Sequence, residues 1–113
     1  MDVQQKDGVT IIATDERLDA VVAPKLKEIV TKLAEESKMK LVIDLSRTQF
    51  IDSSGCGALV ASLRALLKKN GDMKIARPSP QAKTLFELTR LHRVFEIFDD
   101  LESALKSFPS DPE

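Results

Sequence analysis

Six consecutive residues hold most of the chemistry that this sequence can offer. Asp52, Ser53 and Ser54 come directly before the glycine-rich run Gly55-Cys56-Gly57, and an apolar stripe with helical spacing follows. We therefore expect a helix to begin at Ser53 or Ser54. The free N–H groups at a helix N-terminus attract anions, and glycines leave room for a phosphate or an approaching backbone. The segment suits a serine that carries a phosphate or a plain helix cap, and spacing alone favours the cap.

Cys56 of this segment and two residues outside it, Asp19 and His92, also have side chains that could do chemistry. Cys56 lies in the first turn of the predicted helix, where a thiol pKa can be lowered, although a small buried hydrophobe is its more ordinary role. Asp19 precedes another predicted helix and is a candidate to cap it. His92 is the only histidine, and no G-x-S-x-G motif is present, which argues against a serine hydrolase. We expect no catalytic residue, no metal site and no cofactor.

Around this segment the sequence predicts strands that alternate with helices. Short apolar runs bounded by turn residues predict strands over 3–6, 9–14, 40–45, 73–76 and 94–98. Apolar residues at helical spacing predict helices over 24–38, 53–70, 80–91 and 100–108. Asp7-Gly8 is a strong signal for a hairpin turn between the first two strands. Leu41 and Ile43 are expected to be buried in a central strand.

The resulting order, β-β-α-β-α-β-α-β-α, predicts an α/β fold. Strands that are joined by helices run parallel, so we expect a mixed, mostly parallel sheet of about five strands flanked by four helices. A chain of 113 residues fits one domain, which we place over residues 1–108. Residues 109–113 are expected to form a flexible C-terminal tail.

Composition excludes several classes of function. The net charge is −1, with 17 basic and 18 acidic residues, so nothing attracts nucleic acid through bulk charge. No apolar run approaches the roughly 20 residues of a membrane span, and the N-terminus does not resemble a signal peptide. The single cysteine fits a reducing compartment. These features predict a cytoplasmic protein.

The central segment resembles a known signature. Asp44-Leu45-Ser46, followed by Phe50-Ile51-Asp52-Ser53-Ser54-Gly55-x-Gly57, is similar to the motif of the STAS domain of bacterial anti-sigma-factor antagonists. Weaker similarity extends over nearly the whole chain, at Leu18-Asp19 and at Leu88-Thr89-x-Leu91. Three positions depart from the family pattern: Glu16 and Arg90 stand where a glycine is common, and Cys56 replaces the usual aliphatic residue between the two glycines. The predicted domain over residues 1–108 is thus identified as a STAS domain.

The resemblance implies a function for the segment. In the family, the serine after the aspartate is phosphorylated by the anti-sigma factor, which is a serine protein kinase, and Ser53 holds that position. The resemblance implies a partner switch that is not an enzyme: unphosphorylated protein binds the anti-sigma factor and frees the sigma factor. A phosphatase is a further candidate partner. The residues expected at the partner surface are Asp19, Asp52, Ser54, Gly55 and Gly57. The alternative is a STAS scaffold subunit of a transporter or signalling complex that does not switch.

Overall fold

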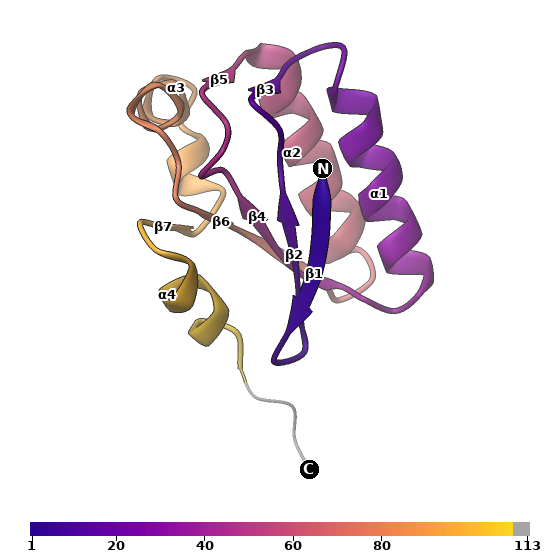
Figure 1. Ribbon diagram of the computed structural model, residues 1–113. Helices are drawn as coiled ribbons and strands as arrows, with labels where there is room; N and C mark the ends of the chain where they lie inside the picture. Colours follow the sequence, from indigo (N-terminus) through magenta and orange to yellow (C-terminus); the bar gives the residue numbers. More distant parts are fainter. Residues whose placement is uncertain (110–113) are drawn as a thin grey trace.

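In this computed structural model, which describes residues 1–109, the chain forms a mixed sheet with helices on both faces (Figure 1). The sheet has the strand order β1-β2-β4-β6-β7. These strands are β1 (Asp2–Lys6), β2 (Val9–Ala13), β4 (Lys40–Asp44), β6 (Asp72–Ala76) and β7 (Ile97–Phe98). The helices are α1 (Ala23–Glu35), α2 (Ser53–Leu67), α3 (Pro80–Leu88) and α4 (Leu101–Lys106). The predicted fold class is confirmed. Of the expected tail, residues 110–113 lie outside the described part of the chain.

The opening hairpin and the parallel part of the sheet have different causes. Asp7 and Gly8 both have positive φ, 54° and 80°, which is the two-residue turn that suits the right-handed twist of a hairpin. β1 therefore pairs antiparallel with β2. The pairs β2–β4, β4–β6 and β6–β7 are parallel, because a helix returns the chain to the same end of the sheet each time.

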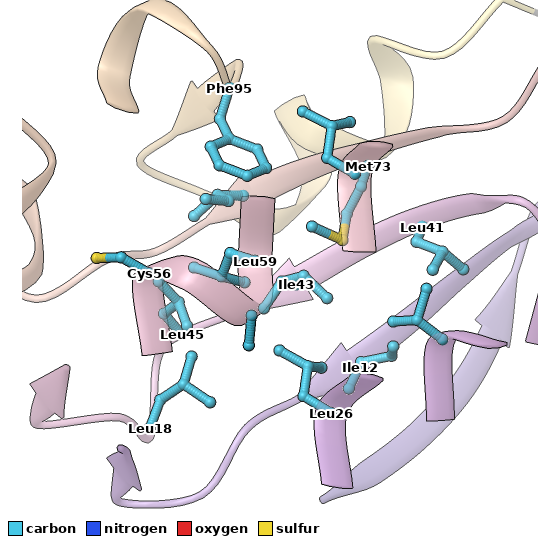
Figure 2. Packing of buried hydrophobic residues seen from close by; sticks show 14 of the residues in the cluster. Ile12, Leu18, Leu26, Leu41, Ile43, Leu45, Cys56, Leu59, Met73 and Phe95 are labelled. Atoms are coloured by element: carbon cyan, nitrogen blue, oxygen red, sulfur yellow. The ribbon is translucent and has the colours of Figure 1, made fainter. Parts of the chain in front are cut away.

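Most of the apolar core lies between the sheet and the layer of α1 and α2. Alternate side chains of β4 point to this face, and Leu41 and Ile43 are fully buried there, as predicted. Leu26 from α1 and Leu59 from α2 meet them in one apolar cluster (Figure 2). The opposite face carries a smaller cluster that α4 covers with Ala104.

Two expectations for the last third of the chain are wrong. The third helix ends at Leu88 rather than near residue 91, and a short 3-10 helix follows at Leu91–Arg93. The strand expected over 94–98 is only β7, Ile97–Phe98. Arg90, at the position where the family commonly has glycine, takes a left-handed φ of 62°, which turns the chain out of the helix. Phe95 is buried from a loop, so its apolar character does not mark a strand.

A second, small sheet was not predicted. β3 (Arg17–Leu18) pairs parallel with β5 (Phe50–Ile51), in a stretch where the sequence analysis expected loops. Strands of two residues are too short for an alternating pattern to reveal them. β5 leads directly into α2, so this small sheet fixes the place where the Ser53 helix begins.

Candidate functional site

Asp52 caps the helix that begins at Ser53. Its side-chain Oδ1 accepts a hydrogen bond from the Gly55 N–H at 2.9 Å, and its carbonyl oxygen accepts one from the Cys56 N–H at 3.0 Å. Ser53 and Ser54 are the first two helical residues, and both are exposed. Within residues 1–109, neither serine hydroxyl makes a hydrogen bond. The interpretation of a serine as the cap is therefore wrong, and the Ser53 hydroxyl has no structural task.

Gly55 allows the start of α2 to lie directly against β3. A Cβ atom at Gly55 would come within 2.1 Å of the Leu18 carbonyl oxygen, which also accepts a bond from the Asp52 N–H at 3.4 Å. Gly55 is buried, so its lack of a side chain is explained by contacts inside the fold. Gly57 is exposed, and a Cβ atom there would meet nothing within 4 Å. Of the two glycines, only Gly57 lies on the outer surface of α2.

The chain entering α2 is held on its other side by Gln81 of α3. The Ile51 N–H donates to Gln81 Oε1 at 3.0 Å, and Gln81 Nε2 donates back to the Ile51 carbonyl at 2.9 Å. The side-chain amide of Gln81 thus satisfies both backbone groups of Ile51, as the backbone of a neighbouring strand would. Ser79 caps α3 and fixes the position of Gln81. Sequence analysis missed Gln81, and no local pattern marks a contact between residues so far apart in the chain.

Asp19 lies at the end of β3, next to the residue on which Gly55 packs. Its carboxylate accepts hydrogen bonds from Arg17 Nε at 3.2 Å and from the backbone N–H groups of Val21 and Val22. The bond from Arg17 and these backbone bonds together lower the pKa of Asp19, despite the opposing effect of desolvation. The Arg17 guanidinium also lies over the Phe50 ring, 4.4 Å from its centroid. Asp19 shapes the turn into α1, and β3 carries it to the same end of the sheet as Ser53.

A second carboxylate is buried at the end of β4. Asp44 Oδ2 lies 2.5 Å from Arg77 Nη2, its Oδ1 accepts from Arg77 Nε at 3.1 Å, and the Ser46 N–H donates to it as well. Burial tends to raise the pKa of Asp44, but the hydrogen bonds from Arg77 and Ser46 outweigh it, and the pKa lies below its ordinary value. Arg77 was not singled out by sequence analysis. The pair holds the ends of β4 and β6 together below the loop that leads to β5.

Residues 1–104 match the family model of the STAS domain. The chain belongs to the STAS domain family. The match includes every element from β1 to most of α4, and with it the segment from Asp44 to Gly57. The predicted family is thus confirmed, and the Ser53 helix is the element of this STAS domain that the sequence motif marks.

Two relatives with about 30% identity to this STAS domain are both named as anti-sigma factor antagonists. An anti-sigma-B factor antagonist of Listeria monocytogenes is 31% identical over 91 residues, which are 80% of this chain and 79% of that protein. The crystal structure of an anti-sigma factor antagonist from Mycobacterium paratuberculosis has 30% identity and a TM-score of 0.83, and the match covers 93% of this chain and 89% of that one.

A more distant structure shares the fold alone. It is the Bacillus cell fate determinant SpoIIAA in its phosphorylated form, with 19% identity and a TM-score of 0.72. The match covers 93% of this chain and 96% of that one. At this identity the likeness shows that the same architecture is present and carries no residue role to this chain.

The other two candidate residues, Cys56 and His92, make contacts within the fold. Cys56 is buried, as expected for a small hydrophobe, and desolvation, together with the charge of Asp52, raises its thiol pKa, which is the opposite of what a reactive thiolate needs. His92 Nδ1 lies 3.3 Å from the Phe86 carbonyl oxygen, and no hydrogen bond joins His92 to Ser53 in the described residues.

Residues 1–109 contain neither a metal-binding cluster of side chains nor a helix that could span a membrane. Within this range, no three side chains of His, Cys, Asp or Glu lie together in a way that could hold a metal ion. None of the helices in the same range combines the length and the apolar character needed to cross a bilayer. The site itself consists of the exposed Ser53 hydroxyl at the start of α2, with the carboxylates of Asp52 and Asp19 nearby.

Proposed function

We propose that this STAS domain is a cytoplasmic anti-sigma-factor antagonist that works as a binding protein and not as an enzyme. Its partner is an anti-sigma factor with serine kinase activity, and the unphosphorylated form of the chain binds it and frees the sigma factor. Phosphorylation of Ser53 ends the complex, and a phosphatase restores the binding form. The observation that carries this proposal is the state of Ser53, which is exposed and is relieved of capping by Asp52.

The charge of a phosphate explains how the switch works. Phosphorylation adds about −1.5 to −2 charges at pH 7. Asp52 immediately precedes Ser53, and the Asp19 carboxylate lies at the end of the adjoining strand β3. Phosphate in an interface with these carboxylates adds like-charge repulsion and a desolvation cost. A loss of about 3–4 kcal/mol weakens binding several-hundred-fold. The helix N-terminus meanwhile accommodates an anion, so the domain stays folded.

The partner surface follows from the exposed residues around the hydroxyl. Ser53, Ser54 and Gly57 are exposed on α2, and Asp52 is partly exposed beside them. Val21, in the turn that Asp19 shapes, is 87% exposed and adds an apolar side chain at this end of the sheet. Gly55 contributes indirectly, because it seats α2 on β3. An approaching backbone can come close to α2 at Gly57, where no side chain intervenes.

Two substitutions of Ser53 test the proposal against a matched pair at Ser54. Ser53→Ala is expected to bind the anti-sigma kinase from the same genome as the wild type does. Ser53→Asp is expected to bind more weakly, because it places one negative charge next to Asp52. Isothermal titration measures both affinities, and circular dichroism checks that both variants are folded. Ser54→Ala and Ser54→Asp make the same changes at the next exposed residue. They control for effects that any substitution in this first turn of α2 would have.

Phosphorylation itself provides the second part of the test. Incubation with the kinase and ATP, followed by intact-mass spectrometry and site mapping, should show a single phosphate at Ser53 and none on Ser53→Ala. Equal affinities of Ser53→Ala and Ser53→Asp, with no phosphate on the wild type, would instead favour the scaffold alternative. In that case the domain would bind its neighbours through a surface that Ser53 does not regulate.

A further inference from the structure

Among residues 1–109, the backbone groups on the outer edge of β1 have no partner. β1 is the first strand of the sheet order and pairs only with β2, so one side of its backbone is free (Figure 1). All of its residues, Asp2–Lys6, are exposed. A free strand edge is a template for pairing with another strand. The question is which strand would fit.

The hairpin determines which backbone groups face outward. Asp7 and Gly8 form a two-residue turn, so the closing pair Lys6–Val9 exchanges ladder hydrogen bonds. Bonded pairs recur at every second residue of an antiparallel ladder, so Gln4 and Asp2 also bond to β2. The N–H and C=O groups of the two residues between them, Val3 and Gln5, point away from β2. They make no hydrogen bond to any other part of the chain within residues 1–109.

We propose that a second copy of this chain pairs with β1, antiparallel and centred on Gln4, so that the two sheets become continuous. In this register Val3 of each copy lies opposite Gln5 of the other, and these are the residues with outward N–H and C=O groups. Asp2 lies opposite Lys6 of the second copy. Pairs that are not hydrogen-bonded have the closest side chains, so the two opposite charges meet directly. The sequence of β1 is thus complementary to itself.

The contacts of Asp2 and Lys6 within their own chain do not prevent them from facing each other across two copies. Asp2 has one ion-pair partner in its own chain, Arg47 at 2.8 Å, and the Asp2 side chain is two-thirds exposed at 67%. Lys6 makes no ion pair within the described residues. Its charge adds slightly to the lowering of the pKa of Glu102, which is mainly due to a hydrogen bond from Lys106. Lys6 can therefore turn toward a second chain without breaking an ion pair in the first.

Pairing through β1 also leaves the Ser53 surface free. Ser53 begins α2, which contacts α1, β5 and β6, whereas β1 contacts its neighbour β2. The inference is thus independent of the proposed switch. A phosphorylation assay can succeed while self-association fails, and the reverse outcome is equally distinguishable.

Exchanging the two charges tests the register. Asp2→Lys alone places two lysines opposite each other across the interface, and Lys6→Asp alone places two aspartates opposite each other. Each variant should therefore self-associate at least about tenfold more weakly than the wild type. An equimolar mixture of the two variants should form a heterodimer, because every lysine then faces an aspartate. Sedimentation velocity from about 10 μM to about 1 mM covers the range in which small interfaces associate.

Gln5→Pro tests the backbone pairing without charge. Proline removes the outward N–H of Gln5 but no ladder bond to β2, and an edge strand tolerates it at such a position. The variant should be folded by circular dichroism and should remain a monomer. A wild type that is monomeric over the whole concentration range would overturn the proposal, and the charges of β1 would then serve only to protect the edge. A dimer that persists in Gln5→Pro, or no heterodimer in the mixture, would overturn it as well.

Discussion

The two faces of the main sheet are built on different principles. The face toward α1 and α2 carries one large apolar cluster, in which Leu41, Ile43 and Leu59 are fully buried. The face toward α4 has a smaller apolar cluster and buries two charged residues, Asp44 and Lys74. Apolar contacts are non-directional, whereas a buried charge needs a specific partner. The Ser53 helix therefore packs on the first face through many apolar contacts, whereas the packing of the second face depends on the specific partners of Asp44 and Lys74.

The same β-strands supply both faces, because their side chains alternate. In β4, Leu41 and Ile43 point toward α2, while Val42 and Asp44 point toward α4. Substitutions on one face therefore test a different kind of interaction from substitutions on the other.

The largest effect is expected where α2 meets β3 on the apolar side. In Gly55→Ala the new Cβ would lie 2.1 Å from the Leu18 carbonyl oxygen, and backbone cannot move aside as a side chain can. We expect a loss of about 3 kcal/mol of unfolding free energy, at the upper end of the usual cost of overpacking. Urea denaturation measures it.

Gly57→Ala is the matched control for this substitution. It also replaces a glycine of α2, but in open space, so it should stabilise the helix by about 0.5–1 kcal/mol. Equal stability of the two variants would show that the contact between α2 and β3 is not tight. A loss of partner binding by Gly57→Ala alone would place Gly57 in the interface.

An intermediate effect is expected for the charged pair on the α4 face. Arg77→Ala leaves the Asp44 carboxylate buried without its two bonds from the guanidinium, which should cost about 2 kcal/mol at neutral pH. Arg64→Ala, at an exposed position of α2, is the control and should change stability little.

The effect of pH follows from the pKa of Asp44. In the wild type this pKa is lowered on folding, so its contribution to stability is present above about pH 4 and is lost as the pH falls through the folded pKa. In Arg77→Ala the hydrogen bonds and the charge of Arg77 no longer lower this pKa, so the pKa of Asp44 should lie higher than in the wild type and protonation should cost the variant less stability. The difference in stability between the two proteins should therefore narrow in acid. A difference that is constant from pH 7 to about pH 3 would show that Asp44 is not the group involved.

The smallest effect is expected for the other buried charge. The ammonium of Lys74 lies 3.1 Å from the Ser107 carbonyl oxygen, 3.4 Å from Glu96 Oε2 and over the Phe108 ring. Lys74→Met keeps the length of the side chain and removes the desolvation cost, so stability should change by less than about 1 kcal/mol. Thermal unfolding measures this, and a loss as large as that of Arg77→Ala would show that Lys74 anchors α4.

The sequence predicted those parts of the fold that leave a local pattern. Asp7-Gly8 marks the hairpin, and short apolar runs bounded by turn residues mark β1, β2, β4 and β6. The start of α2 follows from the glycines and the apolar stripe after them. The family motif added the expectation that Ser53, rather than Ser54, is the modified residue, and this stays a prediction.

The parts that were missed depend on contacts between distant segments. β3 and β5 are two residues each, and they become strands only because the fold places them side by side. Gln81 and Arg77 are polar residues in ordinary surroundings of sequence, yet each bonds a partner about 30 positions away. No periodicity records such a contact, so only the structure identifies these two supports of the site.

The cap formed by Asp52 has a consequence for how this surface can evolve. Because the side-chain cap of this helix comes from Asp52 and not from Ser53, Ser53 can be replaced at little cost to folding. Selection can therefore remove, restore or move the modification without passing through unfolded intermediates. Under the proposed function, sequence drift at Ser53 and Ser54 is constrained by the kinase that would recognise them, while drift at Asp52 and Gly55 is constrained by the fold. A lineage that lost its kinase should then vary first at the two serines.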